Sequence, residues 1–94
     1  NGKYTISDYA IYQVVNHIIS GMEEMDRITR FRINKDNDGI IIDMDVIMVY
    51  GYNLVEAIKR ARKMIETELD RFAALNIRAM YITAKGLVMK NAEP

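Results

Sequence analysis

The chain has 94 residues, 13 basic and 13 acidic side chains and a formal net charge of zero, and half of its residues are hydrophobic. This length fits one domain with one modest core, and a chain without net charge has no long-range attraction to nucleic acid or anionic lipid. The absence of cysteine excludes disulfides, thiolate nucleophiles and zinc–thiolate sites, and it is typical of a reducing cytosol. No apolar stretch approaches the roughly 20 residues that span a bilayer, and no signal peptide is recognisable.

A short strand and a helix are the first elements that the sequence predicts. Residues 3–7 alternate, with Tyr4 and Ile6 on one side. Ser7 suits the capping position of the helix that follows, and Asp8 suits its positive end. Apolar residues then recur at steps of three and four, which predicts one continuous stripe on an amphipathic helix: Ile11, Val14, Val15, Ile18, Ile19, Met22 and Met25.

Two strands joined by a tight turn follow this helix. Residues 27–34 alternate between polar and apolar side chains, and residues 40–50 do so again. The turn between them contains Asn37, Asp38 and Gly39, residue types that tolerate a positive φ angle. The sequence therefore predicts a β-hairpin.

The same region, residues 34–45, has the oxygen-ligand spacing of a calcium-binding loop. Such a loop needs a helix on each side and a glutamate at its last position, whereas both flanks here alternate like strands and the last position is Asp45. A register that buries the apolar residues of both strands places Arg30 and Arg32 on the face of Asp43 and Asp45. We therefore predict cross-strand ion pairs and no metal site.

A second helix and a last strand complete the predicted order. Asn53 can cap a helix that begins at Leu54 and ends before Asn76, and residues 77–85 alternate again. The order strand-helix-strand-strand-helix-strand predicts an α+β domain with a mainly antiparallel sheet and both helices on one face. A ferredoxin-like arrangement is the simplest solution with right-handed crossovers. We expect this domain over residues 1–90 and a tail over residues 91–94.

No catalytic or cofactor-binding residue is predicted. His17, the single histidine, lies on the polar face of its helix with no acidic residue three or four positions away, so it is expected to be solvated. Ser20 lacks the glycine setting of a nucleophilic serine, and the five glycines form no phosphate-binding loop. We therefore expect that the chain is not an enzyme.

The outer face of the predicted sheet is one candidate interaction surface. Ile41, Ile47 and Val49 flank Asp43 and Asp45 on this side, and a strand that is apolar at both ends of its outer face indicates a covered surface. Either the apolar residues 87–89 or a second copy of the chain could cover it. We favour the second copy and expect Val49→Lys to weaken that association.

The second helix carries the other candidate surface. Its basic cluster over residues 59–63 includes Arg60, Arg62 and Lys63, which we predict to contact a protein partner. The alternative is a nucleic-acid-binding module that uses the same basic face. Acidic residues of the same helix balance this charge, and the signatures of common RNA-binding folds are absent, so nucleic acid is the less favoured partner.

Residues 2–7, 39–43, 49–54 and 77–87 follow one another as an opening, an alternating strand, the start of a second helix and a last strand. Together, in this order, they resemble the bacterial alkaline shock protein family, which is also called the envelope stress response family. This resemblance implies a cytoplasmic, non-enzymatic scaffold of cell-envelope stress homeostasis, without a cofactor. It also implies self-association and binding to a membrane-anchored partner. A small-molecule regulatory domain is a further alternative, although the glycine-bearing loop usual in such domains is missing after the first strand.

Overall fold

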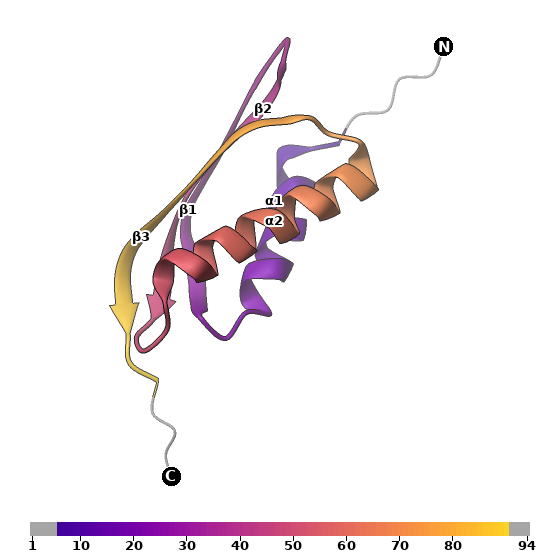
Figure 1. Ribbon diagram of the computed structural model, residues 1–94. Helices are drawn as coiled ribbons and strands as arrows, with labels where there is room; N and C mark the ends of the chain where they lie inside the picture. Colours follow the sequence, from indigo (N-terminus) through magenta and orange to yellow (C-terminus); the bar gives the residue numbers. More distant parts are fainter. Residues whose placement is uncertain (1–5, 91–94) are drawn as a thin grey trace.

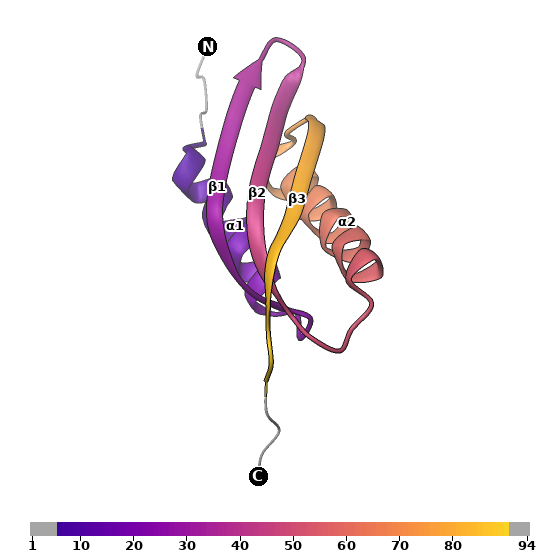
Figure 2. The same ribbon diagram turned by 90° about the vertical axis from the view of Figure 1, so that its left-hand side faces the viewer.

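The computed structural model describes residues 6–90 and shows five elements in one layer of helices and one sheet. They are α1 (Asp8–Ser20), β1 (Met25–Asp36), β2 (Gly39–Val49), α2 (Leu54–Ala73) and β3 (Ile77–Val88). Both helices lie on the same face of the sheet, which leaves its other face uncovered by helix (Figures 1 and 2). The predicted α+β domain with two helices on one face is confirmed.

Short polar side chains begin both helices, as predicted. The Ser7 hydroxyl accepts a hydrogen bond from the Ala10 N–H at 3.0 Å, and the Asn53 side-chain oxygen accepts one from the Glu56 N–H at 3.1 Å. Each cap satisfies an N–H group that has no partner inside its helix. The helix starts were therefore readable from the sequence.

The sheet has the order β1-β2-β3, with β1 antiparallel and β3 parallel to the central strand β2. The sheet is thus mixed, where the sequence predicted a mainly antiparallel one. Because α2 returns the chain to the end at which β2 starts, β3 runs in the same direction as β2 and pairs with it directly. Residues 1–5, most of the predicted first strand, and the predicted tail 91–94 lie outside the described residues, and Ile6 and Ser7 belong to no strand.

The core lies between the helices and the inner face of β2. Small residues lie on the buried face of α2: Ala57 and Ala61 are 1% and 0% exposed. The opposite wall of the core is the central strand β2. Its inner side chains are fully buried, and they are Ile42, Met44, Val46 and Met48.

The turn of the β1–β2 hairpin is fastened to the start of β3. Gly39 has φ 137°, and a Cβ atom there would lie 2.3 Å from the Asn76 carbonyl oxygen. That carbonyl accepts a hydrogen bond from the Ile40 N–H at 2.9 Å, while the Asn76 side chain donates to the Asp38 carbonyl. Only glycine allows both this backbone conformation and this close approach. The hairpin glycine therefore serves the tertiary structure as well as the turn.

Candidate interaction surfaces

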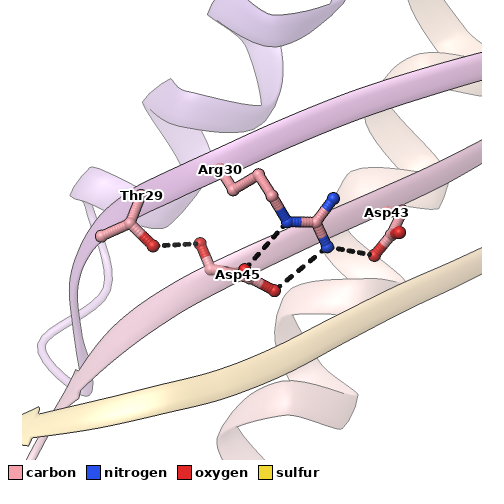
Figure 3. A network of polar contacts seen from close by, with 4 residues as sticks. All are labelled: Thr29, Arg30, Asp43 and Asp45. Atoms are coloured by element: carbon pink, nitrogen blue, oxygen red, sulfur yellow. Dashed lines mark hydrogen bonds and ion pairs between the residues drawn. The ribbon is translucent and has the colours of Figure 1, made fainter.

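An ion-pair network occupies the middle of the outer sheet face (Figure 3). Arg30 Nε donates to Asp45 Oδ2 at 2.9 Å, and its terminal NH2 group donates to Asp43 Oδ1 at 3.0 Å. The Thr29 hydroxyl donates to the Asp45 carbonyl at 3.4 Å. The predicted cross-strand pairing is confirmed for Arg30. Arg32 lies opposite Asp43 in the register, but no ion pair of Arg32 is found within residues 6–90.

This network shifts the pKa of Asp45 and of Arg30. The hydrogen bond from Arg30 holds the pKa of the Asp45 carboxyl below its ordinary value, against the opposing effect of burial. The same bonds to Asp45 and Asp43 raise the pKa of Arg30 further above its ordinary value. Asp45 and Arg30 are therefore both charged at neutral pH, and the hydrogen bonds of Arg30 join β1 to β2. Structural pairing explains this network without a catalytic role.

The apolar residues predicted to form a self-association surface do not form one exposed patch. Ile41 and Ile47 are half-buried on either side of the network, and a Cβ atom on Gly86 would lie 3.3 Å from Ile47 Cδ1. Val49 is 4% exposed, so the rest of the chain already covers it. Val49→Lys would place a charge in a closed site, and this substitution is therefore no clean test of association.

The basic residues predicted on α2 divide between two directions, with Arg60 and Lys63 in one hollow of about 340 Å³ and Arg62 pointing away from it. Arg60 forms an ion pair with Glu24, and this hydrogen bond lowers the pKa of Glu24. Arg62 instead donates to the Met80 carbonyl oxygen of β3 at 3.0 Å. At 100° per residue, Arg60 and Arg62 lie about 200° apart around the helix, so the spacing already indicated this divergence.

Lys63 lies on the α1 side of α2, where it lines a hollow of about 370 Å³ with Ile18 and Met64. Arg60 and Lys63 also share a hollow with Lys59. Arg62 is separated from them, so the three predicted residues do not build one continuous basic surface of the kind that follows a nucleic-acid backbone. This arrangement weakens the nucleic-acid alternative.

A different apolar surface, which the sequence did not reveal, lies where β2 ends and α2 begins. We define the end patch as Tyr50, Tyr52, Leu54 and Leu87, which line a hollow of about 280 Å³ together with Gly51. Tyr50 is 61% exposed, Tyr52 42% and Leu87 49%. The Tyr50 N–H donates to the Val88 carbonyl at 2.8 Å, which joins the two chain segments of the patch. Contiguous exposed apolar side chains of this kind mark interaction sites.

A larger hollow of about 630 Å³ lies at the other end of α2. Phe72, Leu75 and Ile40 supply apolar walls, and Lys35 and Arg71 supply positive charge. A small-molecule ligand of the regulatory alternative would bind here, but the hollow begins beside Ile6, the first described residue. The described structure supplies no further indication of such a ligand.

Neither a metal site nor a membrane-spanning helix is found among the described residues. In residues 6–90 there is no group of three or more His, Asp or Glu side chains that could hold a metal ion. The loop with calcium-like spacing is the turn between β1 and β2, so the predicted hairpin is confirmed. No helix of the described part combines the length and hydropathy required to cross a bilayer.

The comparisons with known proteins identify fold relatives without a sequence match. No protein-family model and no curated protein sequence matches the chain. A histidine-to-alanine variant of the MamM C-terminal domain is similar in structure, with a TM-score of 0.59 at 11% sequence identity over 85% of this chain and 98% of that one. A valine-to-arginine variant of MamM gives a TM-score of 0.60 at 10% identity, over 87% of this chain and 99% of that one. At such identities the likeness establishes the fold alone.

These findings overturn the resemblance to the alkaline shock protein family. The similar solved structures described above are MamM structures, and no family model supports the expected assignment. The matched stretches were mainly alternating strands, such as residues 39–43 and 77–87, and alternation occurs in any half-buried strand. The prediction of that family, and of a role in envelope stress that depended on it, is wrong.

Proposed function

We propose that this chain is a non-enzymatic interaction domain that associates with a second copy of itself through the end patch. The observation that carries this proposal is the exposure of Tyr50, Tyr52 and Leu87 around a single hollow. Tyrosine is enriched in protein–protein interfaces because its ring buries a large area at little entropic cost. The zero net charge adds no repulsion between two copies.

A two-fold symmetric contact suits the shape of this patch. In such an interface the same surface of each copy faces the other, so the exposed Leu87 of each copy could enter the partner's hollow between Tyr50 and Tyr52. The hollow of about 280 Å³ is large enough for a leucine side chain. The proposed contact leaves the ion-pair network on the outer sheet face undisturbed.

The location and further partners of the chain belong to the same proposal. The solved structures with this fold include a C-terminal domain, so the fold can serve as one part of a larger protein. We extend this to the present chain: it acts in the cytoplasm as a dimeric domain, beside a larger partner that can be anchored in a membrane. The absence of cysteine supports a reducing compartment.

Sedimentation equilibrium of the wild-type chain and of Leu87→Lys tests the proposed dimer. Leu87→Lys places a charge in the interface, and we expect it to weaken the dimer at least about tenfold. Phe72→Lys is the matched control, because Phe72 is also an exposed apolar residue, at 61%, but lies at the opposite end of α2. A wild-type chain that stays monomeric at high micromolar concentration would contradict the proposal, as would equal weakening by both substitutions.

A further inference from the structure

The backbone of β3 presents a defined set of hydrogen-bonding groups at its outer edge. The Ile40 N–H donates to the Asn76 carbonyl at 2.9 Å and the Tyr50 N–H donates to the Val88 carbonyl at 2.8 Å, so even-numbered residues of β2 direct their backbone groups toward β3. In a parallel pair these residues bond to the neighbours of their partners. Ile42 is the partner of Met80, so Ala79 and Tyr81 face β2.

The residues between them face away from the sheet. Met80, Ile82 and Ala84 therefore direct their N–H and C=O groups toward the open edge. The position of Arg62 independently supports this assignment of the outward-facing residues, because its guanidinium donates to the Met80 carbonyl from α2 at 3.0 Å. Figure 2 shows β3 at one side of the sheet, with α2 behind it. Within residues 6–90 no side chain is hydrogen-bonded to the backbone of Ile82 or Ala84.

A shallow groove accompanies this edge. Arg62 and Ile58 of α2 form one wall, residues 80–83 of β3 form the other, and the volume is about 260 Å³. The stretch Ala79–Ala84 has no charged side chain, so nothing in it opposes the approach of another strand. The edge thus combines free backbone groups with room for side chains.

Arg62 and Lys85 supply positive charge near the edge, while the acidic Glu66 follows Arg62 one helical turn later on α2. Arg78 forms an ion pair with Asp36 at 3.1 Å, whereas in residues 6–90 no ion pair involves Arg62 or Lys85. Lys85 follows the uncharged stretch, and Arg62 stands beside it. An added strand would gain electrostatic attraction if it carried acidic side chains.

We infer that the β3 edge binds an extended peptide with acidic side chains, which adds to the sheet as a fourth strand. Its backbone would pair with Ile82 and Ala84, and one carboxylate would accept hydrogen bonds from Arg62. A second copy of this chain fits the edge less well, because two paired β3 strands would bring both copies of Arg62 and Lys85 into one small region. The site is separate from the end patch, so the inference does not depend on self-association.

Binding of defined peptides to the full chain tests this inference by NMR. The probe is a short capped peptide of alternating glutamate and valine, and the comparison peptide has lysine in place of every glutamate. We expect the acidic peptide to shift the amide signals of Ile82 and Ala84 and to bind at least about tenfold more tightly than the basic one. Methylation of alternate backbone nitrogens of the peptide should abolish binding.

Two variants assign the contact to the edge. Arg62→Gln should weaken acidic-peptide binding about tenfold, whereas Lys63→Gln removes the same charge on the α1 side of α2 and should leave it unchanged. Ala84→Pro removes an N–H from the exposed edge and should prevent docking, with folding checked by circular dichroism.

Three results would overturn the inference. They are absence of acidic-peptide binding, equal affinity for both peptides, and shifts confined to the end patch. Loss of self-association in Ala84→Pro would assign the edge to a second copy instead. If Leu87→Lys loses self-association but still binds the peptide, the result supports the dimer through the end patch and leaves the inference about the edge standing.

Discussion

The two edge strands of this sheet differ in how their edges are protected. β1 carries six charged residues in its sequence and two irregularities in its pairing with β2, at Asp26 and Thr29. β3 has the same length, but Arg78 and Lys85 are its only charged residues. Charged side chains and bulges keep an edge from accepting another strand. The difference shows that the side chains of an edge strand, more than its place in the sheet, determine whether the edge is open.

The two strands also differ in how they are held to β2. β1 is joined along its middle by the bonds from Arg30 to Asp43 and Asp45. β3 is fastened at its two ends, through Asn76 before its first residue and through the Val88 carbonyl, while its middle depends on backbone pairing and on Arg62. Substitutions at these fastening points should therefore affect the two strands unequally.

Gly39→Ala should have the largest effect, because it disturbs the junction that holds the start of β3. The new methyl group would collide with the Asn76 carbonyl at 2.3 Å, in a conformation that L residues rarely adopt. We expect the free energy of unfolding to fall by about 2–4 kcal/mol in chemical denaturation.

Gly51→Ala is the matched control for this substitution. Gly51 also has a positive φ angle, 110°, but a Cβ atom added there would meet no other atom within 4 Å. Gly51→Ala should lower the free energy of unfolding by about 1 kcal/mol, from backbone strain alone. Equal losses in the two variants would show that the junction with Asn76 does not hold β3.

The sequence was informative wherever a local pattern determines the structure. Ser7 and Asn53 indicated the helix starts, and the run from Asn37 to Gly39 indicated the hairpin, because caps and turns depend on a few neighbouring residues. The parallel pairing of β3 was not predictable in this way. Alternation shows which side of a strand is buried, but it is the same for both strand directions.

The candidate surfaces needed contacts that no single element reveals. Tyr50 continues the alternation of β2, which places it on the same side as the buried Met48, yet it lies just beyond the strand end and is 61% exposed. Leu87 joins the same patch from a distant part of the sequence. The angular spacing on α2 already separated Arg62 from Arg60. Only the structure shows that the Arg62 side chain reaches the Met80 carbonyl.

Acidification should weaken the β1 side of the sheet in particular. The pKa of Asp45 is lowered in the folded chain, so the unfolded chain binds the proton more readily. Its stabilising contribution is therefore complete above the ordinary carboxyl pKa and is lost as the pH falls through the folded value. We expect the midpoint of chemical denaturation to fall as the pH is lowered through and below the ordinary carboxyl pKa, and to fall less in Asp45→Asn. An identical pH profile for the two proteins would exclude Asp45 as a source of this dependence.

The smallest expected effect is a difference in hydrogen-exchange rate between neighbouring amides of β3, and its measurement needs no substitution. Tyr81 and Thr83 direct their N–H groups toward β2, whereas Ile82 and Ala84 direct theirs toward the open edge. Hydrogen exchange measured by NMR should therefore be slow at the first pair and fast at the second, since an amide in a sheet hydrogen bond exchanges only after local opening. Uniformly slow exchange along β3 in the monomeric Leu87→Lys variant would mean that the edge is already covered. Addition of the acidic peptide should then slow Ile82 and Ala84 alone, because only their N–H groups gain a new acceptor.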